Sequence, residues 1–217
     1  QSNYPIISFS IGPYEVAGDD ITAWTAMLDD HLGSGNCLAG VAVGNDGEKP
    51  WPQSRIQVPS DSVNALSIGA ADCTTEGWKR APYSSIGPGR NPGMVKPDIV
   101  AFGGVKTNAF HFVSPQLNIV ENYGTSFATP YAMRIASGLK SYLGSSLTPT
   151  AIRALMVHSA SRNQHPIEEV GWGMLGELTD IITCQDGEIK VLYQGRLDPG
   201  KVLRAPIPLP EQQLEGN

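Results

Sequence analysis

The apolar positions of the first 43 residues predict a strand, a helix and a second strand. Residues 4–11 form a nearly continuous apolar run, which is typical of a buried strand. Residues 18–32 place apolar side chains three or four positions apart, and Asp19 or Asp20 could cap this helix. Residues 36–43 form a second continuous apolar run. A strand, a helix and a strand in this order make a βαβ unit, so we expect the two strands to be parallel.

The pattern continues with further strands and two long helices. Strands are predicted at 63–71 and 97–103, and an alternating hairpin at 105–121. Helices are predicted at 124–143 and 149–160, the first with an unusual number of small residues. The whole pattern indicates an α/β fold with a largely parallel central sheet and helices on both faces.

The pattern changes after residue 180. Short alternating segments lead into an extended, proline-rich end, so we expect residues 181–217 to begin a C-terminal β domain that is cut short. Residues 1–180 would then be part of one larger domain. The chain begins at Gln1 and enters a strand directly, so we expect a piece of a longer protein, with cytoplasmic and secreted locations both open. No apolar stretch approaches the ~18 residues of a membrane span.

Composition and charge exclude several classes of function. Asp and Glu number 21 against 15 Lys and Arg, a net charge of −6 without a basic stripe, so nucleic acid is not an expected partner. The three cysteines, Cys37, Cys73 and Cys184, are widely spaced, so neither a disulfide framework nor a zinc site is expected.

The segment GTSFATP, residues 124–130, carries the first candidate for chemistry. It places Ser126 at the start of the long helix, where backbone N–H groups lack partners and the helix dipole is positive. A serine there could attack a carbonyl carbon, and its own N–H would face the developing oxyanion. Taken alone, Ser126 could equally be an ordinary helix cap.

The segment VAVGNDG, residues 41–47, carries the second candidate. Asn45 follows a buried parallel strand directly, and ligand-binding groups collect at the carboxyl ends of such strands. Its side-chain amide could donate a hydrogen bond to an oxyanion. Taken alone, Asn-Asp-Gly is also ordinary turn chemistry.

Together these segments resemble motifs of the subtilisin-like serine proteases, the subtilases. GTSFATP is similar to the family's nucleophile motif and VAVGNDG to its oxyanion-asparagine motif. VNALSIGAAD, KPDIVAFGG and FSIGP resemble further family segments in the family's order, and the resemblance covers about residues 1–180. It implies a subtilisin-like fold and a serine endopeptidase that forms an acyl-enzyme on Ser126, with Asn45 as the oxyanion donor.

The resemblance also assigns substrate-binding residues. Residues Ser10, Ile11 and Gly12 would pair with a peptide or protein substrate as an added strand. The opposite wall of the pocket for the residue before the scissile bond would be formed by Ala42, Val43 and Gly44. These small residues would leave room for a sizeable apolar side chain.

The catalytic base is expected outside this chain. In subtilases the order is Asp, His, Ser, and both partners precede the substrate-binding strand with which this chain begins. We therefore expect the upstream part of the same catalytic domain as a partner, and an inactive isolated chain. Subtilases can bind calcium, but no Asp-rich ligand run appears, so no metal or cofactor is expected.

Three alternatives remain open from the sequence. The domain could hold peptides without cleaving them. The 44–47 turn could bind an anion in an α/β domain for small ligands. His158 or His111 could serve as a base within the chain.

Overall fold

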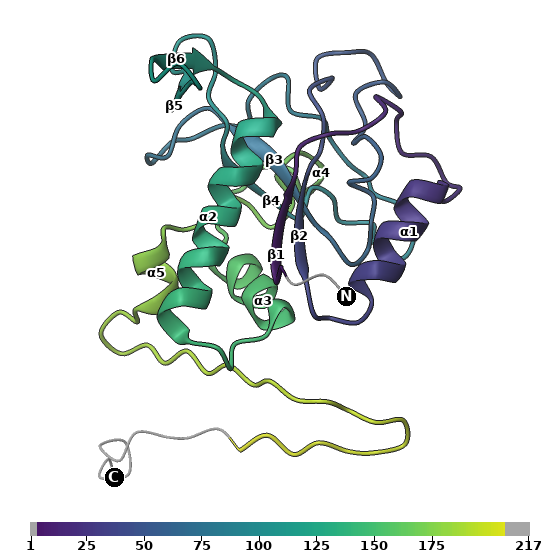
Figure 1. The fold of residues 1–217 in the computed structure, drawn as a ribbon, viewed down its shortest axis with the longest axis vertical. Coiled ribbons are helices and arrows are strands. Elements are labelled where there is room, and N and C mark those ends of the chain that lie inside the picture. Colours follow the sequence, from purple (N-terminus) through teal and green to yellow (C-terminus); the bar gives the residue numbers. More distant parts are fainter. Residues whose placement is uncertain (1–3, 207–217) are drawn as a thin grey trace.

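A four-stranded sheet forms the centre of the molecule. The computed structural model describes residues 4–206 (Figure 1). The strands β1 (Ile6–Phe9), β2 (Leu38–Ala42), β3 (Leu66–Ala71) and β4 (Ile99–Phe102) lie in that order, and each pairs with the next in parallel. This arrangement confirms the parallel sheet predicted from the continuous apolar runs.

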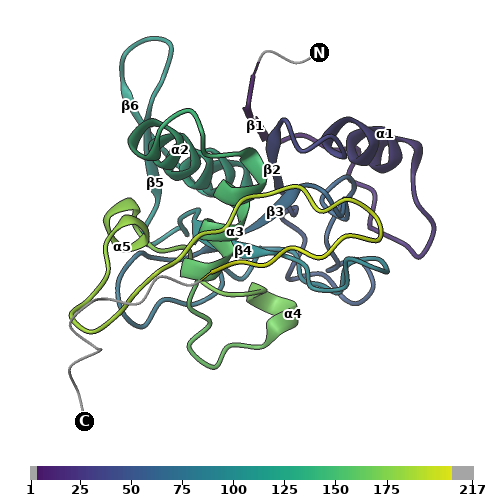
Figure 2. The same cartoon turned by 90° about the horizontal axis from the view of Figure 1, so that it is seen from below.

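Helices cover both faces of the sheet. On one face lie α2 (Thr125–Leu143), α3 (Pro149–Ser159) and α5 (Leu178–Ile182), and on the other lie α1 (Ala23–Leu32) and α4 (Ile167–Val170) (Figure 2).

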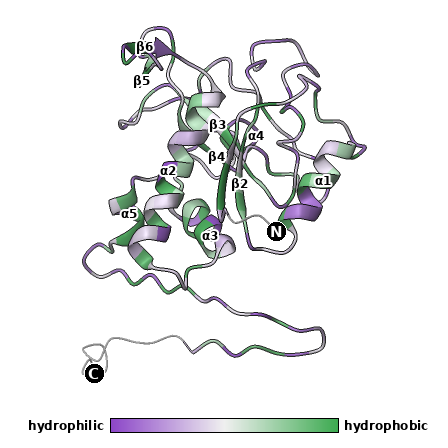
Figure 3. Ribbon diagram, in the orientation of Figure 1, coloured by the Kyte–Doolittle hydropathy of each residue, from purple (hydrophilic) through white to green (hydrophobic). Residues whose placement is uncertain are grey.

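Alternating side chains of the strands supply the two faces. In β1, Ile6 packs into the core under α2, whereas Ile7 packs with Leu28 of α1. The strands of the central sheet are accordingly coloured mainly as hydrophobic (Figure 3). The expected covering of both faces is confirmed.

Small residues let α2 lie close against the sheet. Ala128, Ala132 and Ala136 are completely buried, and α2 contacts all four strands. A Cβ atom added at Gly40 of β2 would lie 2.4 Å from the sulfur of Met133. The close approach fixes the position of the first turn of α2 relative to the ends of β1 and β2.

A hairpin lies beside the start of α2. Its strands β5 (Phe110–Val113) and β6 (Ile119–Asn122) are antiparallel, as the alternating pattern predicted. Phe110 stacks on Phe127 with ring centroids 5.6 Å apart. The hairpin is thus attached to the helix through an aromatic contact next to Ser126.

The start of the first helix differs from the sequence-based expectation. The first helix begins at Ala23 and is capped by the hydroxyl of Thr22, which accepts from the backbone N–H of Thr25, so neither Asp19 nor Asp20 is the cap. Asp and Thr both cap helices well, so local sequence could not choose between them.

The expected boundary at residue 180 falls inside α5. Ile181 is buried in the main core, so the packed unit extends through this helix. Strands were expected from residue 181, but residues 183–206 contain none and run along the outside of the body (Figure 1). Residues 207–217 lie outside the described residues, so a further β domain stays a prediction.

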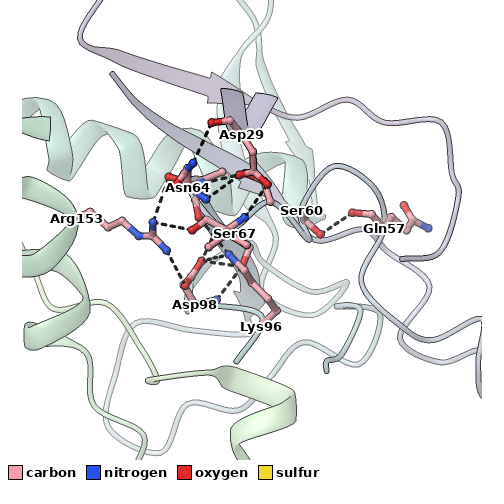
Figure 4. Close-up of polar contacts among 11 residues, drawn as sticks. Asp29, Gln57, Ser60, Asn64, Ser67, Lys96, Asp98 and Arg153 are labelled. Atoms are coloured by element: carbon pink, nitrogen blue, oxygen red, sulfur yellow. Dashed lines mark hydrogen bonds and ion pairs between the residues drawn. The ribbon is translucent and has the colours of Figure 1, made fainter. Parts of the chain in front are cut away.

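A buried ionic network joins β3, β4 and α3 (Figure 4). The ammonium group of Lys96 lies 2.7 Å from Oδ2 of Asp98, and both side chains are almost completely buried. The same oxygen accepts from the backbone N–H and the hydroxyl of Ser67. Arg153 of α3 reaches Oδ1 of Asp98 at 3.4 Å. The network therefore fixes the amino ends of β3 and β4 against α3.

No helix within residues 4–206 is long and apolar enough to cross a membrane.

Candidate active site

Three segments meet at the carboxyl end of the sheet and line one cleft. The segment 10–12 follows β1, residues 42–45 comprise the last residue of β2 and the three that follow it, and α2 begins at Thr125. The cleft has a volume of about 210 Å³ and is lined by side or main chains from all three segments. It contains all but one of the residues proposed from sequence, namely Ser10, Ile11, Gly12, Ala42, Gly44, Asn45 and Ser126.

Asn45 is held in one orientation by the first residue of α2. Its Oδ1 accepts from the backbone N–H of Thr125 at 2.9 Å and from the hydroxyl of Thr125 at 3.0 Å. A backbone N–H can only donate, so the atom facing it is the oxygen. The NH₂ group of Asn45 is consequently the donor that this side chain can offer to a ligand in the cleft.

Ser126 lies in the first turn of α2, and a proline alters the hydrogen bonds around it. Pro130 stands four residues later and has no N–H, so the carbonyl of Ser126 lacks its usual helical donor. The hydroxyl of Ser10 donates to that carbonyl at 3.2 Å instead. The strand extension that follows β1 is thereby linked directly to the nucleophile candidate.

This link predicts a moderate loss of stability in Ser10→Ala. The Ser126 carbonyl would lose its protein donor while remaining partly accessible to water, so we expect the free energy of unfolding to fall by about 1 kcal/mol. Urea denaturation would measure it. Ser8→Ala is the matched control, because Ser8 is exposed on β1 and its hydroxyl makes no hydrogen bond within the described residues. Equal midpoints for the two variants would contradict the assigned role of Ser10.

Val43 does not line the cleft. It is completely buried in a small cluster with Ala17 and Ile56, because successive residues of an extended chain point to opposite sides. Its backbone still supports the cleft wall, since its carbonyl accepts from the N–H of Gln57 at 2.8 Å. The expectation that Val43 lines the pocket is wrong for the side chain.

Two polar residues of the cleft, Gln57 and Asp46, were not among the site residues predicted from the sequence. Gln57 is 7% exposed, and its Nε2 donates to Oδ2 of Asp46 at 2.8 Å. A Cβ atom added at Gly44 would lie 2.5 Å from the Gln57 amide, so this side chain occupies the space beside Gly44. The room expected for a sizeable apolar side chain is therefore bordered by polar groups.

None of the histidines of residues 4–206 lines this cleft. His111 pairs with Glu121 across the exposed hairpin at 3.2 Å, and His158 lines a separate hollow between α3 and α5. His165 lies against the ring of Trp78, and His31 is on the exposed side of α1. The described part of the chain therefore brings no imidazole into the cleft beside Ser126.

Asp46 is the acidic residue that lines the cleft. Asp46 also accepts from the ammonium group of Lys49 at 3.0 Å. No group of three or more His, Cys, Asp or Glu side chains that could hold a metal ion occurs in the described residues.

A family model described as the subtilase family, peptidase S8, matches residues 1–173. The chain belongs to the subtilase family. The match contains every residue of the cleft, so the resemblance inferred from the two motifs is confirmed. Among curated proteins, no sequence matches this subtilase chain.

Three solved proteases share the fold of this subtilase chain. The prenylagaramide maturation protease PagA is 23% identical, with a TM-score of 0.64 over 83% of this chain and 62% of PagA. The self-cleaved protease domain of PatA is 22% identical, with a TM-score of 0.63 over 82% and 61%. A psychrophilic protease is 21% identical, with a TM-score of 0.60 over 78% and 56%. The chain thus spans about three fifths of these structures.

Proposed function

We propose that this chain is the substrate-binding and nucleophile part of a serine endopeptidase. The observation that carries the proposal is the meeting of Ser126, Asn45 and the segment 10–12 in one cleft. These groups are a nucleophile at a helix start, an oriented amide donor and an extended chain beside them. Such a set suits the cleavage of a peptide bond.

The reaction would proceed through an acyl-enzyme. Oγ of Ser126 attacks the carbonyl carbon of the substrate, and the resulting oxyanion accepts hydrogen bonds from the NH₂ of Asn45 and the N–H of Ser126. The C–N bond then breaks, the amine leaves with a proton, and water hydrolyses the ester to regenerate Ser126. An imidazole must take and return the proton, and we assign it, with its orienting carboxylate, to the upstream part of the same catalytic domain. No cofactor takes part in these steps.

Residues 10–12 would hold the substrate backbone. Pairing of β1 with β2 ends at Phe9, and residues 10–12 make no main-chain hydrogen bond with the rest of the described chain. Ile11 is 67% exposed. Free N–H and C=O groups next to a nucleophile allow a peptide to add as a strand, with its scissile carbonyl near Ser126.

The test is hydrolysis of a peptide substrate by the full-length protein and its Asn45→Ala variant. We expect kcat to fall by about 10²–10³-fold with little change in KM, because the donor acts on charge that develops only in the transition state; subtilisin is itself a reference case for this magnitude. Ser126→Ala should abolish hydrolysis. Equal kcat for Asn45→Ala and the wild type would remove Asn45 from the proposed mechanism.

A non-catalytic peptide-binding domain is the second candidate, favoured by the absence of an imidazole from the cleft within residues 4–206. It predicts binding of peptides by the full-length protein without turnover. An Asp motif and a His motif upstream of Gln1 would decide for the protease.

A further inference from the structure

A second hollow lies at the end of the body that is remote from the cleft (Figure 1). Its volume is about 670 Å³, and it is lined by the end of α2, by α3, by α5 and by residues between 184 and 194, called here the segment 184–194. Ser126 lies in the first turn of α2 and Leu143, its last residue, borders the hollow, which places the two about 25 Å apart along the helix axis. The hollow is therefore separate from the candidate active site.

The segment 184–194 is attached to the body at two points. The ammonium group of Lys190 donates to the backbone carbonyls of Asp180 and Thr183, at the end of α5, at 2.8 Å each. The backbone N–H of Thr148, which caps α3, donates to Oε1 of Gln194 at 2.8 Å. These two attachments hold the segment over the hollow.

The walls of the hollow are mainly apolar and are not packed against each other. Leu147, Leu155 and Ile182 line it from the body. Val191 and Leu192 line it from the segment, yet they remain 42% and 39% exposed. The volume lies within the range of about 300–1,000 Å³ that is typical of small-molecule sites. The space therefore suits an elongated apolar ligand that would contact both walls.

Charge favours a ligand with an acidic group. Among the described residues that line the hollow there is no Asp or Glu, although the chain carries a net charge of −6. Two of the three N–H groups of the Lys190 ammonium are used on the carbonyls at the end of α5, so one is left, and its charge offsets the negative end of that helix. His158 also lines the hollow, and its ring makes no hydrogen bond within the described residues.

We propose that this hollow binds a fatty acid. The alkyl chain lies between α3 and the segment 184–194, where its burial removes apolar surface of both walls from water. The carboxylate accepts from Lys190 and His158, and hydrogen bonds between charged groups are stronger than neutral ones. The inference does not depend on the proposed function, because the site shares no residue with the cleft.

The experiment measures binding of cis-parinaric acid, a fluorescent fatty acid, to the full-length protein. Dodecanoate, dodecanol and dodecyltrimethylammonium, which carry the same alkyl chain, then compete with this probe below their micelle concentrations. We expect dodecanoate to displace the probe at a concentration about tenfold lower than dodecanol does, because only the acid gains a hydrogen bond between charged groups. The cation should displace the probe least.

A space-filling variant locates the binding site. Ala154 is an exposed residue of α3 that lines the hollow, so the ring in Ala154→Phe would occupy the space without removing a buried side chain. We expect the affinity for the probe to fall by about tenfold or more. Ala23→Phe is the matched control, because Ala23 is exposed on α1 and does not line the hollow. Its affinity should equal that of the wild type.

A second variant tests recognition of the acidic group. Lys190→Met keeps an apolar stem, so it should weaken dodecanoate binding by about tenfold and leave dodecanol binding unchanged. A merely structural role of Lys190 would weaken both ligands alike. Lys201→Met is the control, because Lys201 is an exposed lysine further along the chain that does not line the hollow. Both ligands should bind it as they bind the wild type.

Several results would overturn the proposal. These are absence of probe binding, equal displacement by the three competitors, or stronger displacement by dodecanol or the cation. Probe binding that is unchanged in Ala154→Phe, or dodecanoate binding that is unchanged in Lys190→Met, would do the same. Hydrolysis of peptides at Ser126 is measured separately, so these results leave the proposed function as it stands.

Discussion

The isolated 217-residue chain is expected to remain unlabelled by an active-site fluorophosphonate, whereas the full-length protein should be labelled at Ser126. Within residues 4–206 no imidazole lines the cleft, so the Ser126 hydroxyl stays protonated and is a poor nucleophile. Without its base, a triad serine retains only the ~10³–10⁴-fold acceleration over water that the oxyanion hole and binding provide. Mass spectrometry of the labelled peptide would measure the difference.

Two controls make the comparison decisive. Ser126→Ala in the full-length protein should abolish labelling, and circular dichroism should show that the isolated chain keeps its helices under the labelling conditions. Stoichiometric labelling of the folded, isolated chain would overturn the expectation. Loss of that labelling in His158→Ala or His111→Ala would then identify the base inside this chain.

Asp98→Ala is expected to lower the free energy of unfolding by about 3–5 kcal/mol. The substitution leaves the ammonium group of Lys96 buried without its carboxylate partner, and removing one member of a buried ion pair costs about this much. Asp186→Ala, which removes an exposed carboxylate, should change the free energy by less than about 0.5 kcal/mol. Urea denaturation of both variants would test this.

A double variant and a pH series test the cause of that loss. Lys96→Met with Asp98→Leu removes both charges, so it should be more stable than Asp98→Ala, although Ser67 and Arg153 still lose their acceptor. Burial alone would raise the pKa of Asp98, but the charges of Lys96 and Arg153 outweigh burial and lower it. Its contribution to stability is therefore complete above the unfolded pKa of about 3.9 and is lost as the pH falls through the folded value. An equal loss of unfolding free energy in Asp98→Ala and Asp186→Ala would contradict the role of the network. So would an Asp98→Ala variant whose stability falls with decreasing pH in the same way as that of the wild type.

The strands and long helices could be predicted from the sequence because burial imposes a simple pattern on each. The strands β2 and β3 are buried on both faces and consist of continuous apolar runs, and α2 has its small residues on the side that meets the sheet. The two motifs likewise indicated that Asn45 and Ser126 belong together. Asn45 follows the end of β2 and Thr125 begins α2, and the two residues are joined by a hydrogen bond from the Thr125 N–H to the Asn45 side chain. The place where these two elements meet therefore brings Asn45 next to Ser126.

Other features depend on contacts between segments that no local pattern encodes. Gln57 belongs to an irregular loop, and its place over Gly44 follows from the path of that loop across the end of the sheet. The alternating residues after 181 indicated strands, but a strand needs a neighbour to satisfy its backbone groups, and residues 183–206 pair with none. Val43 was assigned to the pocket by the resemblance to the subtilases, although its side chain points into the core.

Pro130 removes one hydrogen bond from the first turn of α2 and leaves the carbonyl of Ser126 available to the segment that follows β1. A residue with an N–H at this position would complete the helix ladder by binding the carbonyl of Ser126. The carbonyl has two lone pairs, so the hydroxyl of Ser10 could still bind it, but as the second of two donors. In the present chain the segment that follows β1 therefore supplies a hydrogen bond that the helix itself leaves out.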